Sequence, residues 1–359
     1  MFESMRFHKQ VSVVCVLSVF SAGQALAQRE AGVTPQLVWK TEARFTAVGA
    51  ARLYGDGSLL LADAGARELY LATAKGVVQQ IGRAGDGPGE YRSPQSVHRF
   101  RDGLSVVVDP RLRRFSVVDS LGGFKRNIPF PPGAGGLSGR VSADREGRMW
   151  FLGSPANLLG SREVPLSRLD VAGGRVDSVS VVVGELLADL SSPAREGTRG
   201  PQLRRTLMVV PYAAKDGFAA QPLGGVAVFR SSSRQLEWLD SLGRVTRSRR
   251  IPAPFEVDIP SEDLRRIRPE ALRKLVPARQ MAFEVDFLVA GDKGEVWLRR
   301  VIPSDTTRSQ WIVLPPQGKE RTVTLMRRAR LLTVEGSLLV VAEADEDDLE
   351  SVVVYRLPQ

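Results

Sequence analysis

An eight-residue pattern recurs along the chain, and this repetition constrains the fold more than any other feature. In each copy a bulky apolar residue opens an expected strand, and a glycine follows seven positions later. The copies are Leu69–Gly76, Phe115–Gly122, Leu166–Gly173, Leu236–Gly243 and Trp311–Gly318. In three of them an aspartate stands three residues before the glycine, which favours a tight turn with Asp first and Gly fourth. Each copy is therefore predicted to be a strand that turns back into the next strand.

Further strands extend each copy into a unit of four. The order of strand, Gly turn, strand, polar loop, strand, Gly turn, strand begins near Phe45 and recurs at intervals of about forty residues or more. Some strands are predicted with definite bounds, among them Glu68–Ala72, Arg114–Val118, Arg148–Leu152 and Gln235–Leu239. The last unit ends with Ser351–Leu357 and lacks its fourth strand.

A lone apolar strand before the first unit can fill that gap. Gln36–Lys40 carries Leu37, Val38 and Trp39, and its pairing with the last unit would close a ring and remove an exposed sheet edge. We therefore predict an all-β fold, a six-bladed β-propeller closed by its N-terminal strand. An open two-sheet sandwich does not account for the regular position of the glycines.

Three segments carry a resemblance to a known family. Ile81–Tyr91 (IGRAGDGPGEY), followed by Ser93 and Pro94, resembles the Gly-rich, Pro-containing blade junction of NHL-type propellers. Ser58–Asp63, followed by Arg67, is similar to the strand and the Asp-to-Arg spacing of the same repeat. Glu350–Leu357 resembles the closing strand of exported bacterial six-bladed propellers of unassigned function. The resemblance implies the fold and no single activity, because the family carries no agreed one.

The N-terminus has the features of a secretory signal peptide. Arg6 and Lys9 form a basic start, Val11–Phe20 is an apolar run, and Ala25-Leu26-Ala27 is a small-x-small cleavage site. We predict that residues 1–27 are a leader and that residues 28–359 form one propeller domain. The only cysteine, Cys15, lies in the leader, so the mature chain contains no disulfide. We expect a periplasmic or secreted protein without a membrane span.

Two long insertions interrupt the repeats. Gly184–Thr206 is rich in Ser, Pro, Gly and Arg, and we predict a mobile loop there. Ser261–Arg279, between the fourth and fifth blades, has apolar residues at helical spacing, with Ser261 as an N-cap and Pro269 starting a second short helix. Packing of this helical strap on the propeller rim is the simpler interpretation. A lid over the central channel is the alternative.

The chain is basic, with 50 Lys and Arg against 40 Asp and Glu and a formal net charge of +10. Such a surface attracts polyanions. Nucleic acid is an unsuitable partner for an exported protein, so we predict no nucleic-acid binding. Arginine used for solubility is the simpler interpretation of the net charge.

The sequence lacks the residues that several kinds of catalytic or metal site require. The glycines from Gly82 to Gly89 are followed by no Lys-Ser or Lys-Thr pair and no helix, which argues against a phosphate loop. His98 is the only histidine beyond the leader, which excludes a multi-His zinc site. Calcium-bound lactonase-type propellers, which are similar in outline, use Asn and acidic ligands, whereas this chain has only Asn127 and Asn157. We predict no catalytic residue, no metal ligand and no cofactor.

One acidic run, Glu343 to Glu350, contains six carboxylates. Closely spaced oxygen ligands can hold calcium. The run lacks the glycine and the alternating ligand spacing of a calcium loop, so a solvated acidic loop is the favoured interpretation.

Arginines recur in or beside the loop between the second and third strands of five successive blades. Equivalent loops of a propeller lie on one face, and guanidinium groups bind carboxylate, sulfate or phosphate in bidentate fashion. Arg67 and Arg113 follow an aspartate at one shared spacing and are interpreted as structural. The predicted anion-binding residues are Arg111, Arg162, Arg234 and Arg308.

The leading hypothesis is an exported binding or interaction module of the cell envelope, whose loop face holds an acidic ligand or a protein partner. The alternative is a calcium-assisted hydrolase or lactonase with a carboxylate-lined central channel. A scaffold whose channel is plugged by apolar side chains is a third hypothesis. The sequence does not choose between an open and a plugged channel, and it leaves the oligomeric state open.

Overall fold

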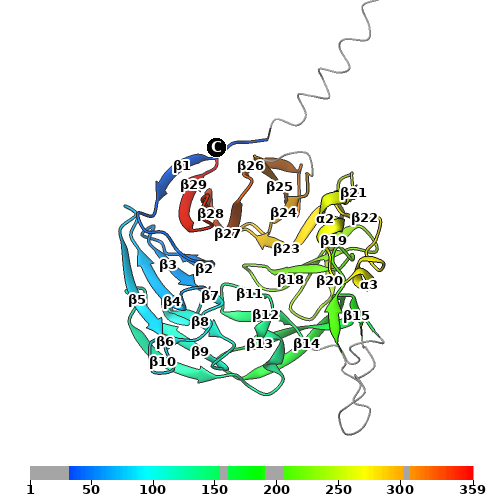
Figure 1. Ribbon diagram of the computed structural model, residues 1–359. Coiled ribbons are helices and arrows are strands. Elements are labelled where there is room, and N and C mark those ends of the chain that lie inside the picture. Colours follow the sequence, from blue (N-terminus) through cyan, green and yellow to red (C-terminus); the bar gives the residue numbers. More distant parts are fainter. Residues whose placement is uncertain (1–31, 154–160, 191–205, 303–306, 359) are drawn as a thin grey trace, which may run out of the picture. The chain divides into compact units, whose positions relative to one another are not determined.

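Six antiparallel sheets follow one another along the chain and form a six-bladed β-propeller (Figure 1). The computed structural model describes residues 32–153, 161–190, 206–302 and 307–358. The predicted leader lies outside these ranges. None of the helices in the described ranges has the length and apolar character that a membrane crossing requires.

The bounds of the strands are as follows, from the innermost to the outermost strand of each blade. Blade 1 contains β2 (Val48–Leu53), β3 (Leu59–Asp63), β4 (Glu68–Ala72) and β5 (Val78–Ala84), with β6 (Glu90–Tyr91) parallel to β5. Blade 2 contains β7 (Ser96–Arg99), β8 (Ser105–Asp109), β9 (Arg114–Val118) and β10 (Phe124–Pro129). Blade 3 contains β11 (Val141–Ala143), β12 (Arg148–Leu152), β13 (Glu163–Asp170) and β14 (Arg175–Val183).

The second half of the chain repeats this order. Blade 4 contains β17 (Gly217–Ala220), β18 (Val226–Arg230), β19 (Gln235–Leu239) and β20 (Val245–Arg250). Blade 5 contains β23 (Phe283–Ala290), β24 (Val296–Arg300), β25 (Arg308–Leu314) and β26 (Arg321–Met326). Blade 6 contains β27 (Ala329–Glu335), β28 (Leu338–Ala344) and β29 (Glu350–Arg356), with β1 (Gln36–Lys40) antiparallel to β29 as its outermost strand.

The core is divided among the blade interfaces. The second strand of a blade is covered on both faces by its neighbours, so its sequence is a continuous apolar run, as in β3 and β8, where every residue is buried. One buried apolar cluster lies between each pair of successive blades. A further cluster joins blade 6 to blade 1, where Val340 and Val352 pack with Leu59 and Leu61. The hydrophobic contacts therefore run around the whole ring.

Most of the repeated glycines adopt the backbone conformation that their turns require. Gly76, Gly122, Gly243 and Gly318 have φ between 82° and 96°, in the left-handed region that glycine enters without a Cβ penalty. In the third copy the left-handed residue is Gly174 (φ 65°) and not Gly173, because the turn that begins at Asp170 is one residue longer. The expected register is therefore displaced by one residue in blade 3.

The two insertions pack against each other. In the first, β15 (Leu187–Asp189) pairs with β16 (Leu207–Val209), so the ends of the expected mobile loop form a hairpin. In the second, β21 (Glu256–Asp258) and β22 (Arg279–Met281) flank helices α2 (Ser261–Arg266) and α3 (Glu270–Arg273). Leu272 of α3 is buried in a cluster with Ala188 and Val210 of the first insertion. Residues 191–205 lie outside the described ranges.

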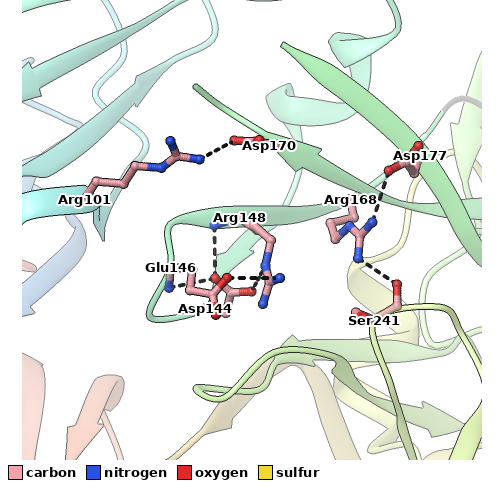
Figure 2. Close-up of polar contacts among 8 residues, drawn as sticks. All are labelled: Arg101, Asp144, Glu146, Arg148, Arg168, Asp170, Asp177 and Ser241. Carbon is pink, nitrogen blue, oxygen red and sulfur yellow. Dashed lines mark hydrogen bonds and ion pairs between the residues drawn. The ribbon is translucent and has the colours of Figure 1, made fainter. Parts of the chain in front are cut away.

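Arginine side chains tie successive blades together. Figure 2 shows two of these ties: Arg168 donates to the carbonyl of Ser241 in blade 4 over 2.7 Å, and Arg101 pairs with Asp170 of blade 3 at 3.3 Å. The remaining junctions have similar contacts, from Arg52 to Leu104, Arg247 to Pro316, Arg299 to Arg327 and Arg330 to Val48. Part of the arginine content therefore has a structural use inside the ring.

Candidate functional site

A cavity lies in the centre of the ring. It has a volume of about 480 Å³ and is lined by the innermost strand of every blade: β2, β7, β11, β17, β23 and β27. Its wall contains apolar and ionisable side chains together. The channel is therefore neither filled nor purely apolar, and its ionisable groups determine what it can bind.

Five of the described arginines line this cavity, and four of them are engaged by the protein. Arg140 donates to backbone carbonyls of Val285, Asp286 and Leu288 in β23. Arg145 pairs with Asp292 at 2.9 Å, and Arg330 binds the carboxylate of Glu350 at 2.9 Å. Burial lowers the pKa of Arg140 to about 10, so this guanidinium stays charged at neutral pH.

The fourth engaged arginine, Arg52, is almost fully enclosed, with 7% of its surface exposed. It donates to Ser105 Oγ at 2.5 Å and to the carbonyls of Gly103 and Leu104. Its Nε is buried and has no hydrogen-bond acceptor among the described residues. Burial is the main cause of its lowered pKa, and repulsion from Arg99 adds to the effect.

Arg99 differs from the other four. It is the last residue of β7, it is exposed, and its side chain forms no hydrogen bond or ion pair with any residue that the structure describes. It lies close enough to Arg52 to lower the pKa of that residue. Arg99 therefore adds a guanidinium without a side-chain partner beside Arg52, and an anion bound there would reduce the repulsion between the two groups.

The carboxylates of the channel wall also divide into those with a side-chain partner and one without. Asp144 is buried and bound by Arg148 at 2.7 Å, as Figure 2 shows, and Asp286 pairs with Lys215 at 2.8 Å. Asp292 pairs with Arg145 and also accepts the backbone N–H of Gly336 at 2.7 Å. Glu335, the last residue of β27, accepts no side-chain hydrogen bond and forms no ion pair within the described part of the chain.

Electrostatics place Glu335 near the unbalanced arginines. Burial and the charge of Asp292 raise the pKa of its carboxyl group, while Arg99, Arg52 and Arg145 oppose that shift. The wall of the channel therefore holds one guanidinium and one carboxylate that influence each other without direct contact. Both stand at the ends of innermost strands, beside the first turn of their blades.

A second hollow of about 430 Å³ adjoins this end of the channel. It shares Arg52 and Arg99 with the channel wall and is further lined by Tyr54, Asp102 and Asp119. The Tyr54 hydroxyl contacts Ser105 Oγ at 2.7 Å, and burial raises the Tyr54 pKa. Arg52 and Arg99 therefore line both hollows.

His98 also lines the channel, where its Nε2 lies 3.0 Å from Ser96 Oγ. Burial lowers its pKa to about 4, so the ring is neutral at physiological pH. Among the described residues, no carboxylate contacts the ring, and Ser96 Oγ is its only hydrogen-bond partner. The arrangement is that of a satisfied structural histidine and not of a catalytic triad.

The arginines predicted from the loops lie at the other end of the blades, since the loop between the second and third strands is opposite the first turn. Arg162 donates to the carbonyls of Gly184 (3.0 Å) and Ala214. Arg234 stacks over Phe255 at 4.9 Å and lies 3.9 Å from Glu256. Arg111 is exposed, and Arg308 begins β25. The four do not line the described cavities, and their role in binding stays a prediction.

The recurrence of arginine in those loops has a partial backbone explanation. Arg67, Arg113 and Arg234 each directly precede the third strand of a blade and adopt positive φ (65°, 51° and 58°). Asp63 and Asp109 accept backbone N–H groups of the same loops and of the preceding blade linkers. These arginines therefore occupy equivalent turn positions, and the turn geometry explains part of their recurrence without a role for their charge.

The acidic run is used within the protein. Glu350 pairs with Arg330, Asp345 with Arg44 at 3.1 Å, and Glu343 accepts the Tyr355 hydroxyl at 2.6 Å. Across the described ranges, no group of three or more His, Cys, Asp or Glu side chains is arranged to hold a metal ion.

Comparisons with known proteins support the fold and do not identify an activity. No protein-family model matches the chain, and no curated protein matches it. A member of the DUF4221 family from Bacteroides vulgatus is similar in structure, with TM-score 0.52 and 8% identity over 91% of this chain and 96% of that one. A Bacteroides fragilis protein described as exported has TM-score 0.50 and 13% identity over 90% and 94% of the two chains. The descriptions of these two proteins name no activity, and the similarity supports the fold alone.

Sequence reasoning did not find Arg99 and Glu335. Neither belongs to a repeated motif, because the ends of the innermost strands vary from blade to blade. The available signal was positional: Glu335 and Gly336 form the first turn of the last blade, and Arg99 ends the strand that contains His98. Charged residues at the ends of innermost strands are the candidates for a channel mouth.

Proposed function

We propose that the protein is an exported binding module whose central channel receives an acidic ligand, with Arg99 as the anchor. The observation that carries this proposal is the contrast within the cavity wall, where Arg99 alone among five lining arginines has no partner in the described part of the chain. A free guanidinium binds a carboxylate through two parallel hydrogen bonds. Arg52, next to it, adds positive charge and a buried donor without an acceptor.

The size of the cavity supports a small ligand. About 480 Å³ lies within the range of pockets that enclose small molecules. A protein partner could also insert an acidic side chain or a C-terminal carboxylate into the same mouth. Both share one recognition chemistry, a carboxylate held by Arg99.

Export is part of the proposal. The basic start, apolar run and small-x-small site of residues 1–27 support a cleaved leader. Mass spectrometry of the protein recovered from the periplasm or the medium should find an N-terminus at Gln28. Recovery of the uncleaved chain from the cytoplasm would contradict this part.

A thermal-shift screen of residues 28–359 tests ligand binding, since a ligand of the folded state raises the melting temperature. Small carboxylic acids should raise it in the native protein and not in Arg99→Ala. Arg126→Ala, which removes an exposed charge of β10 away from the described cavities, is the matched control and should respond as the native protein does. A shift with Ca²⁺ alone would instead favour the calcium-assisted hydrolase, and an equal response in Arg99→Ala would exclude Arg99 as the anchor.

A further inference from the structure

The free carboxylate of Glu335 limits which acids can bind. If Arg99 holds an acidic group, as proposed above, a second unpartnered group with negative charge stands within its electrostatic range. A simple acid would bring its own carboxylate near Glu335, and like charges at short range are unfavourable. An acid that also carries a hydrogen-bond donor would satisfy both protein groups.

The charged residues near Glu335 are bound to other partners, so the Glu335 carboxylate can accept a hydrogen bond from a ligand. Asp292, whose charge contributes to the raised pKa of Glu335, is already bound to Arg145 and to the N–H of Gly336. Arg52 donates to Gly103, Leu104 and Ser105, and Asp144 is bound to Arg148. A ligand entering the mouth therefore meets Arg99 and Glu335 as the two charged wall residues whose side chains have no hydrogen-bond or ion-pair partner among the described residues.

We infer that the channel mouth is a site for a small carboxylate that also bears a hydrogen-bond donor, with Arg99 binding the carboxylate and Glu335 accepting from the donor. The donor is a hydroxyl group in a sugar acid or an ammonium group in an amino acid, and these two sources share the recognition chemistry. Glu335 is in this role the specificity-determining residue, and Arg99 is the affinity-determining residue. The inference rests on the proposed function.

Neither group is required by the fold in its present surroundings. Arg99 and Glu335 make no side-chain hydrogen bond or ion pair to the described residues, so their replacement removes no observed contact. Glu335→Gln keeps the shape of the side chain and removes its charge. Both variants are therefore expected to fold, which keeps the test decisive.

Isothermal titration with two matched ligand pairs tests the inference. The first pair is gluconate and hexanoate, and the second is γ-aminobutyrate and butyrate; the members of each pair share a carbon count and differ in donors. The native protein should bind at least one donor-bearing acid about ten- to a hundredfold more tightly than its plain partner, the range of a hydrogen bond to a charged group. The pair that shows the preference distinguishes the sugar acid from the amino acid.

The variants separate this inference from the proposed function. Glu335→Gln should retain binding of the plain acids and lose most of the preference, whereas Arg99→Ala should lose binding of all four. Glu346→Gln, an exposed carboxylate in the acidic loop, should change nothing. An unchanged preference in Glu335→Gln, with binding still lost in Arg99→Ala, would overturn the role of Glu335 and leave the acid site standing. Failure of all four acids to bind the native protein would overturn both.

Discussion

At the residue scale, the informative feature is which charges the protein leaves without a partner. The channel wall contains nine Arg, Asp and Glu residues. All but Arg99 and Glu335 form side-chain hydrogen bonds or ion pairs with other residues of the described structure. Glu335 is half-buried and Arg99 is exposed, and a half-buried charge without compensation lowers the stability of the free protein. Such residues are typical of binding sites, where the ligand supplies the missing contacts.

Glu335→Gln should therefore stabilise the unliganded protein at neutral pH. Its carboxyl pKa is raised above the ordinary value of 4.5, so the folded state disfavours the charged form. This unfavourable contribution is fully present above the folded pKa and absent below the unfolded one. Urea unfolding should show a gain in the free energy of unfolding at pH 7.5 that disappears near pH 3.5. Glu346→Gln should show no such pH-dependent gain, and a loss of stability at pH 7.5 in Glu335→Gln would mean that the charge is compensated.

The loop arginines allow a second residue-scale prediction. Arg162 donates to two backbone carbonyls, of Gly184 and Ala214, so Arg162→Ala leaves both without this donor. The free energy of unfolding should fall by about 1–3 kcal/mol. Arg111→Ala, at an exposed position of an equivalent loop, should stay within about 0.5 kcal/mol. Loss of acid binding with unchanged stability in Arg162→Ala would instead favour the predicted ligand-binding role of that face.

At the element scale, the repeat predicted the blades well because one physical pattern defines each strand. Glu68–Ala72, Arg114–Val118, Arg148–Leu152 and Gln235–Leu239 have in the structure the bounds expected from the sequence. Their apolar runs and Gly turns are local features. The two short helices of the second insertion were predicted, with Pro269 directly before α3, although Ser261 is the first helical residue of α2 and not its N-cap. The first insertion was predicted less well, since β15 and β16 are short strands and Ala188 of β15 packs with Leu272 of α3, which lies far along the chain. The channel mouth was missed for a related reason: it is assembled from strand ends that are far apart in sequence.

The turn glycines provide a prediction at this scale. Gly243 has φ 82°, and a Cβ there would lie within contact distance of the Val179 carbonyl oxygen in blade 3. Gly243→Ala should therefore destabilise the protein by about 2 kcal/mol or more through backbone strain and a clash with main chain. Gly173→Ala is the matched control, because Gly173 lacks positive φ and its nearest neighbour, 2.9 Å from a Cβ, is the mobile tip of Asp170. Equal thermal stability of the two variants would contradict this account.

At the scale of the whole molecule, part of the arginine content serves to join the blades of the ring. At the six junctions between blades, an arginine reaches the neighbouring blade or its linker, and most of these guanidinium groups bind backbone carbonyls. A guanidinium can serve several carbonyl acceptors at once, which lysine cannot do with the same geometry. The positive net charge is thus partly a consequence of how the blades are joined, and it is weak support for a polyanionic partner.

The pairing of β1 with β29 closes the ring, and removal of the N-terminal residues would leave blade 6 without its outermost strand. β1 forms the outer strand of blade 6 through its pairing with β29, and Trp39 packs against the cluster shared by blades 6 and 1. A chain that begins at Thr41 exposes the edge of β29, so its melting temperature should fall and it should self-associate in sedimentation experiments. Leu37→Ala, which alters a β1 side chain that is 62% exposed, should leave both properties unchanged.

A peptide of residues 28–40 distinguishes loss of the strand from general damage. If β1 stabilises the ring by occupying the open edge, the added peptide should raise the melting temperature of the truncated chain in a concentration-dependent way. The same peptide should not affect the full-length mature chain, because its edge is already occupied. A truncated chain that stays monomeric with an unchanged melting temperature would show that the apolar clusters between the blades hold the ring without its outermost strand.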